Sequence, residues 1–279
     1  MFGRLLILLL AVLPKHLLSR AAGFLADRRV PASWRPTVYR GYCRIFGANP
    51  DEAELPFALY PTLNAFFTRA LKPGIRPVVG HAIVCPADAA VGAYGSVSND
   101  TLLQAKGRTY SLATLLGDPS LADRMGGGTY TTLYLSPKDY HRFHVPVDGR
   151  ITRAAYIPGQ LWPVNTAAVA HVPDLFAVNE RLVVTIECGH GGVMAVVAVG
   201  ATIVGKTRVV FDDLHTNARR RELQHRAYDP PLPVQAGGPL GHFEFGSTLV
   251  LVCSNACGVI EPLRPGQTVR VGQRLGPLA

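Results

Sequence analysis

Apolar and polar positions divide this chain into two parts, and the pattern changes near residue 75. Before that point apolar residues recur at helical spacing. After it, short runs rich in Val, Ile and Tyr alternate with Gly and Pro, which is typical of strands and turns. The pattern predicts an α+β, mainly β fold, with an N-terminal helical region over residues 1–75 and a β-rich body over residues 76–279.

The N-terminal part begins with an apolar run, Leu5–Leu13, which Pro14 closes. The run is far shorter than the roughly 20 residues that a helix needs to span a bilayer. A helix is expected next, over Lys15–Arg29, with one apolar side and one polar side. The apolar side comprises Leu17, Leu18, Ala21, Ala22, Phe24 and Leu25. Such a helix can lie in a membrane interface or can pack on its own domain.

Further elements follow from the same reasoning. A second helix is expected over Leu63–Leu71, with Thr62 as its N-cap and Pro73-Gly74 after its end. The expected strands are the first half of 129–149, then 150–157, 183–188, 193–204, 248–253 and 258–261, followed by short strands in 263–276. Residues 206–245 are rich in charge, Pro and Gly, and the prediction for them is mostly exposed loop.

The distribution of charge along the chain indicates what kind of partner the N-terminal part binds. The net charge is +9, and residues 1–40 hold seven Lys or Arg against one acid, Asp27, a net +6. Basic residues around an apolar helix favour peripheral attachment to an anionic membrane rather than binding to nucleic acid. One alternative is a secretory signal, with Ala21-Ala22 as the small residues before cleavage. The five cysteines contain no Cys-x-x-Cys pair, which favours a reducing compartment.

The most informative chemistry lies at Gly246-Ser247-Thr248, directly before an apolar strand. Glycine leaves its carbonyl unshielded, so the Ser247 hydroxyl can reach the carbonyl carbon of Gly246. Attack there would replace the amide by an ester, which elimination and hydrolysis would convert into a new chain end carrying a pyruvoyl group. The alternative is an ordinary tight turn before a strand.

Three ionisable residues could assist this serine. Asp88 is flanked by small or apolar residues, so it either needs a partner or caps a turn. His141 and His144 lie close together after a predicted strand and can move protons near neutral pH. Zinc binding by His-x-x-His is a competing hypothesis, but no further ligand has suitable spacing. An Asp–His–Ser trio also fits a serine hydrolase, although the chain lacks Gly-x-Ser-x-Gly.

Several longer motifs resemble one family, phosphatidylserine decarboxylase of the bacterial membrane-associated type. The resemblance runs almost from end to end. The motifs are Leu13-Pro-Lys15 with Ser19-Arg20, Asn64-x-Phe66-Phe67-x-Arg69, Pro86-Ala-Asp88, 104–112, Tyr134-Leu-Ser-Pro-Lys-Asp-Tyr-His-Arg142, 172–181, 199–205 and Phe245-Gly-Ser-Thr248.

The resemblance implies that the proenzyme cuts itself between Gly246 and Ser247. The products would be a β chain, 1–246, and an α chain, 247–279, that begins with the pyruvoyl cofactor. It implies that Asp88, His144 and Ser247 drive the cut and that His141 handles the proton during decarboxylation. The pyruvoyl group would form a Schiff base with phosphatidylserine and yield phosphatidylethanolamine, without a metal. The two chains would stay together as a heterodimer, or as a dimer of heterodimers, on the cytoplasmic face of the cell membrane.

Three positions depart from the family pattern: Ala89, Phe245 and Ala236. Ala89 and Phe245 crowd the reacting residues without removing a reacting atom, so they bear on the rate of the cut. Two other hypotheses remain. A serine hydrolase using Asp88, His144 and Ser247 would keep its chain intact, as would a membrane-attached β module without catalysis.

Overall fold

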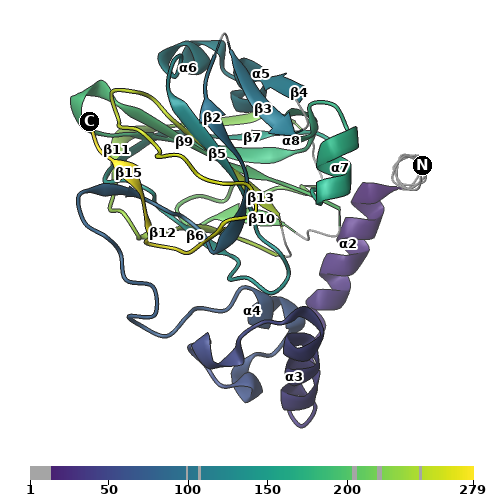
Figure 1. Cartoon of the computed structure of the whole chain (residues 1–279). Helices are drawn as coiled ribbons and strands as arrows, with labels where there is room; N and C mark the ends of the chain where they lie inside the picture. Colours follow the sequence, from purple (N-terminus) through teal and green to yellow (C-terminus); the bar gives the residue numbers. More distant parts are fainter. Residues whose placement is uncertain (1–13, 99, 106–107, 203–205, 219–221, 245–246) are drawn as a thin grey trace.

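The computed structural model describes residues 14–98, 100–105, 108–202, 206–218, 222–244 and 247–279. It is β-rich with short helices (Figure 1), which confirms the predicted α+β, mainly β class. The helices are α2 (Lys15–Ala26), α3 (Arg35–Phe46), α4 (Leu63–Phe67), α5 (Leu112–Leu116), α6 (Pro119–Arg124), α7 (Thr166–His171) and α8 (Leu175–Val178). The 3-10 turns are η1 (Pro50–Glu52), η2 (Phe57–Leu59) and η3 (Gly189–Gly191).

The strands form one large sheet and three small ones. The large sheet is antiparallel, in the order β11-β7-β8-β9-β13-β5-β2-β14. Its strands are β2 (Ala89–Ser96), β5 (Thr129–Tyr134), β7 (Gly149–Ile157), β8 (Arg181–Glu187), β9 (Val193–Val199), β11 (Gln224–Val234), β13 (Thr248–Cys253) and β14 (Thr268–Val269). The small sheets are β10-β12-β6 (Thr207–Val209, Pro239–Phe243, Arg142–His144), β1-β15 (Ala82–Val84, Arg274–Pro277) and β3-β4 (Thr101–Ala105, Arg108–Ser111).

Both faces of the large sheet are covered. In β13, Leu249 and Leu251 join a core shared with the small sheet β10-β12-β6, while Val250 and Val252 join a core shared with α5–α8. Successive side chains of a strand point to opposite faces, so a central strand between two layers must be apolar throughout. This explains the unbroken apolar runs of β9 and β13, and Figure 1 shows the two layers on either side of the sheet.

Helix α2 presents its apolar side outward. Leu17 is 64 % exposed and Leu25 is 69 % exposed, whereas Lys15, Ser19 and Ala26 are buried. The helix therefore does not dock through its apolar stripe, as a surface helix packed on its own domain would. None of the helices in the described ranges is long and apolar enough to cross a membrane. The run Leu5–Leu13 lies outside the described residues.

Several element predictions need correction. The loop prediction for 206–245 is wrong, because β10, β11 and β12 lie there. The predicted strand over 258–261 is also wrong: the segment makes only an isolated bridge, between Gly258 and Leu278. The second helix begins at Leu63 as predicted, and the Thr62 hydroxyl caps it by accepting from Ala65 N at 3.0 Å, but the helix ends at Phe67.

Candidate active site

Ser247 lies directly before β13, the strand at the centre of the large sheet. Its side chain is fully buried, and its hydroxyl donates to the carbonyl oxygen of Val199, at the end of β9. Its own carbonyl accepts from Leu135 N at 2.8 Å, just after β5. Ser247 is thus held between the two strands that flank β13. Gly246, on the other side of the predicted cut, lies outside the described residues.

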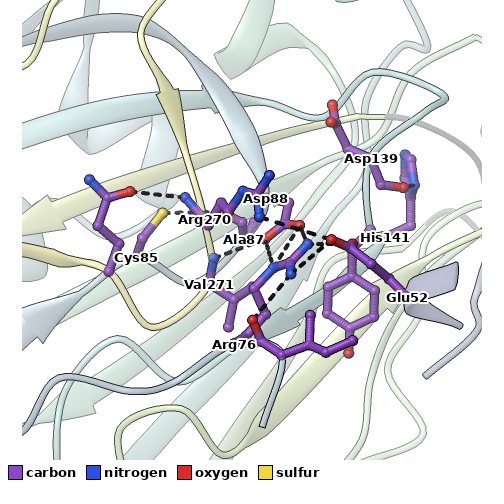
Figure 2. A network of polar contacts seen from close by, with 12 residues as sticks. Glu52, Arg76, Cys85, Ala87, Asp88, Asp139, His141, Arg270 and Val271 are labelled. Carbon is purple, nitrogen blue, oxygen red and sulfur yellow. Dashed lines mark hydrogen bonds and ion pairs between the residues drawn. The ribbon is translucent and has the colours of Figure 1, made fainter. Parts of the chain in front are cut away.

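Asp88 is buried and has the partner that its apolar surroundings require. The Nε of Arg76 lies 3.0 Å from both carboxylate oxygens, and the backbone N–H of Val271 donates to Oδ1 at 2.9 Å. Arg76 also binds Glu52 at 2.7 Å, so its guanidinium joins two carboxylates (Figure 2). The expectation that Asp88 is paired is confirmed. Its partner Arg76 was not predicted, since no local pattern marks a pair between residues 12 positions apart.

The pKa values of this network follow its hydrogen bonds. The hydrogen bond from Arg76 lowers the pKa of Glu52 below its usual value. Burial alone would lower the pKa of Arg76, but its hydrogen bonds to Asp88 and Glu52 raise that pKa overall. Arg76 therefore stays charged, and it forms ion pairs with two carboxylates that would otherwise be costly to desolvate.

Replacing Arg76 by alanine should lower the free energy of unfolding by about 3–5 kcal/mol, because the buried carboxylate of Asp88 would lose its cation. The side chains of the pair are largely buried, 9 % and 11 % exposed. Urea unfolding of the uncut chain would measure the loss. The matched control is Arg274→Ala, which breaks the ion pair with Glu261, whose partners are 44 % and 49 % exposed. That change should cost at most about 1 kcal/mol, and equal losses in the two variants would contradict the prediction.

His141 is fully buried and lies against the ring of Phe67, with ring centroids 3.9 Å apart. Its Nδ1 lies 2.8 Å from the carbonyl oxygen of Asp139 (Figure 2). A carbonyl can only accept, so Nδ1 carries the proton and Nε2 keeps its lone pair. Within the described part of the chain, Nε2 has no hydrogen-bond partner. Burial lowers the pKa of His141 to about 3, so the ring is neutral at pH 7.

This burial should make stability depend on pH. The folded-state pKa of His141 is depressed to about 3. The contribution of neutral His141 to the free energy of unfolding is therefore fully present when the pH is above the pKa of the unfolded state, about 6.5. The contribution is lost as pH falls from about 6.5 towards 3, since the unfolded state binds the proton first. From pH 7 to pH 5 the loss from this residue should be about 2 kcal/mol.

Urea unfolding of uncut chains with and without His141→Gln, at pH 7 and pH 5, would measure that loss. The variant should show a smaller decrease between the two pH values. The same decrease in both chains would show that His141 is not the residue responsible.

His144 ends β6 and has partners on both ring nitrogens. Its Nδ1 donates to the Gly237 carbonyl at 2.8 Å, so Nε2 accepts from the Tyr140 hydroxyl at 3.1 Å. Burial lowers the pKa of His144, and the charge of Asp88 opposes that shift. His144 is therefore a neutral base whose Nε2 lone pair accepts a hydrogen bond from Tyr140.

Backbone hydrogen bonds bring these residues to one end of the sheet system. The Phe243 N–H donates to the His141 carbonyl at 2.9 Å, and the His144 N–H donates to the Pro86 carbonyl at 2.8 Å. The connection from β5 to β6 thus lies against both the Asp88 segment and the segment that leads to Ser247. No direct hydrogen bond joins Asp88, His144 and Ser247 in the described ranges, because each side chain has another partner. A proton relay through them requires Tyr140 and Ser247 to change partners.

The competing hypothesis, zinc binding by His141 and His144, requires at least one further ligand close to them. Across the described residues, no three or more His, Cys, Asp or Glu side chains are grouped so that they could hold a metal ion. A polar cavity of about 200 Å³ lies beside Asp88, and Tyr140 and Lys138 contribute to its wall.

Comparison with known proteins identifies the relatives of this chain. The family model described as phosphatidylserine decarboxylase matches residues 63–277, and a second model, described as PSD, matches residues 5–37. A phosphatidylserine decarboxylase proenzyme of Anaeromyxobacter sp. (strain K) is 46 % identical over 285 aligned positions that cover all of both chains. A proenzyme of the same name from Myxococcus xanthus is 42 % identical, over 96 % of this chain and 96 % of the relative. The one from Pseudomonas putida F1 is also 42 % identical, over 99 % of this chain and 98 % of the relative.

Proposed function

Because the chain belongs to the phosphatidylserine decarboxylase family, we propose that it converts phosphatidylserine to phosphatidylethanolamine and carbon dioxide, using a pyruvoyl group made from Ser247. The enzyme is a carboxy-lyase. The observation that carries the origin of the cofactor is the complete burial of the Ser247 side chain. A serine that attacks an external ester must face an open pocket, whereas attack on the preceding carbonyl needs no access from outside.

The cut follows from the chemistry of a serine next to a glycine. The Ser247 oxygen attacks the carbonyl carbon of Gly246, and the C–N bond breaks to give an ester and a free amine. Elimination across Cα–Cβ of residue 247 releases Gly246 as a carboxylate. The dehydroalanine that remains tautomerises to an imine, and water hydrolyses the imine to the ketone with loss of ammonia.

The neighbouring residues provide the proton transfers for this cut. His144 is the base for the Ser247 hydroxyl, once the Tyr140 hydroxyl leaves the lone pair on Nε2. The charge of Asp88 favours the imidazolium that results, and the Gly237 carbonyl, rather than this carboxylate, accepts the hydrogen bond from Nδ1. The Val199 carbonyl, to which the hydroxyl donates, holds Ser247 before the reaction.

During turnover, the pyruvoyl ketone supplies an electrophile that takes up the substrate amine and withdraws the electron pair left by carbon dioxide. The buried Nε2 of His141 is available for proton transfer beside such a group, because no donor in the described part of the chain makes a hydrogen bond to its lone pair. His141 then exchanges a proton with the substrate carbon. Because His141 is neutral at pH 7, it first takes up the proton that the substrate ammonium loses on condensing with the ketone, and it then donates that proton to the carbon that carbon dioxide has left.

The N-terminal helix accounts for how the enzyme reaches a lipid substrate. The outward apolar residues of α2 would enter the interface of an anionic membrane, and the net +6 of residues 1–40 would strengthen the attachment. We place the enzyme peripherally, on the cytoplasmic face. The β chain, 1–246, and the α chain, 247–279, would stay together because β13 pairs with β5 and β9 of the β chain.

An intact mass spectrum of the denatured protein tests this proposal. Two species are expected, and the smaller should cover residues 247–279 with a pyruvoyl terminus that resists Edman degradation. The purified protein should also release labelled carbon dioxide from phosphatidylserine. An uncut chain whose Ser247 is labelled by a phosphonate would instead favour the serine hydrolase. An uncut chain that neither reacts with a phosphonate nor turns over lipid would favour the binding module.

A further inference from the structure

The largest cavity described beside the reacting segment is a groove of about 580 Å³ between α2 and the body. Arg20 and Phe24 of α2 form one wall, and Lys206, Asn217 and Glu244 belong to the other. The hydrogen bond from Arg20 Nη2 to the Ala218 carbonyl, at 3.4 Å, crosses between the walls. Figure 1 shows α2 along the side of the body where β10 lies. We call this cavity the basic groove.

The charges of the basic groove favour an anion. Of its two acids, Glu244 is paired with Arg208 at 2.9 Å, whereas Asp27, among the described residues, accepts only from the neutral Asn64 amide, at 2.9 Å, so the two cations of the groove outnumber its one unpaired carboxylate. Its two cations, Arg20 and Lys206, form no ion pair with any residue that the structure describes. Lys and Arg side chains that are not paired with a carboxylate are the groups that proteins use to bind phosphate oxygens.

The groove also has the right position for a substrate. Glu244 lies three residues before Ser247, so the two Cα atoms are at most roughly 10 Å apart. The Glu244 N–H donates to the Lys206 carbonyl at 2.7 Å, which holds the backbone of Lys206 beside this segment. On the outer side, Phe24 is 59 % exposed and belongs to the apolar face of α2. The wall of the groove thus includes a residue three positions before Ser247 as well as a residue of the surface proposed to meet lipid.

We propose that Arg20 and Lys206 bind the phosphodiester of the phospholipid head group; this inference rests on the proposed function. In the serine head group, four covalent bonds separate the phosphorus from the amine nitrogen. A phosphate held in the groove would therefore direct the amine towards residue 247 and leave the acyl chains beside α2. The two cations are specificity-determining residues in this arrangement, and they take no part in the proton transfers.

The test measures KM and kcat for Arg20→Ala, Lys206→Ala and Lys206→Arg, with dihexanoyl phosphatidylserine kept below its critical micelle concentration. Without a bilayer, general attraction to an anionic surface cannot contribute. Each alanine variant should raise KM about tenfold with kcat and self-cleavage unchanged, because a charge-assisted hydrogen bond is lost. Lys206→Arg should restore KM to within about threefold of the original. The matched control is Arg44→Ala, which removes an exposed cation of α3 outside the groove and should leave KM unchanged.

Two outcomes would overturn the inference. One is that the Arg20 and Lys206 variants keep the original KM for the soluble lipid, and lose activity only on anionic vesicles and to the same extent as Arg44→Ala. The other is a lower kcat at constant KM. A binding titration of the same soluble lipid to the full-length Ser247→Ala chain separates the inference from the proposed function. A Kd raised about tenfold by Lys206→Ala supports the phosphodiester site even if no lipid is decarboxylated, whereas an equal Kd refutes it.

Discussion

Replacing Ser247 by alanine should leave a single uncut chain with no detectable decarboxylation. Without the hydroxyl, the Gly246 carbonyl has no neighbouring nucleophile, and the elimination that creates the ketone has no ester to act on. The fold should persist, because the change removes only one hydrogen bond, to Val199, from a residue at the start of a well-paired strand. A denaturing mass spectrum and release of labelled carbon dioxide would measure the two effects.

Ser254→Ala is the matched control for this experiment. Ser254 is also buried and follows the other end of β13, where its hydroxyl accepts from Val193 N at 2.8 Å. That variant should be cut normally and should lose only about 1 kcal/mol of stability. A Ser247→Ala chain that is still cut before residue 247 would refute the proposed origin of the cofactor.

Replacing His144 and His141 by alanine should separate self-cleavage from turnover. His144→Ala should block the cut, because the proposed base for the Ser247 hydroxyl is lost. His141→Ala should still yield cut chain, but turnover per cut chain should fall roughly 10²–10⁴-fold, the usual contribution of a general acid or base. The distinction rests on their partners: His144 Nε2 is reached by Tyr140, whereas His141 Nε2 is bare and buried.

A time course on denaturing gels would give the rate of the cut, and carbon dioxide release normalised to cut chain would give the rate of turnover. His225→Ala is the control, because His225 lies exposed on β11 and should affect neither rate. Equal effects of the two active-site variants on cutting, or a His144→Ala chain that matures normally, would contradict the assignment of roles.

Local pattern predicted the central strands well. The prediction for 150–157 corresponds to β7 (Gly149–Ile157), and that for 248–253 matches β13 (Thr248–Cys253). Both strands are buried on at least one face, and a buried strand needs apolar residues, so their composition was enough to predict them. The failure at 206–245 has the opposite cause. Strand β11 is an edge strand that pairs only with β7 and contains three prolines, which an edge tolerates and which resemble loop in a sequence.

The candidate site was predicted in part. Ser247, Asp88 and both histidines were identified from residue types and from the family resemblance, and the structure brings their segments to one end of the sheet system. The residues that hold them were not predicted. Arg76 binds Asp88 from 12 positions away, and Gly237 binds His144 from 93 positions away. Pairs that form only when distant segments meet leave no periodic signal along the chain.

The sequence by itself determined the β-rich class, the place of Gly-Ser-Thr directly before a strand and the amphipathic character of the first helix. Each of these depends on residue type and on spacing within one segment. Only the tertiary structure decided that the Ser247 side chain is buried in the uncut chain, that Asp88 forms an ion pair with Arg76, and that α2 turns its apolar side outward. The physical reason is that spacing tells which side chains share a face, whereas burial and ion pairing depend on what the rest of the chain places against that face.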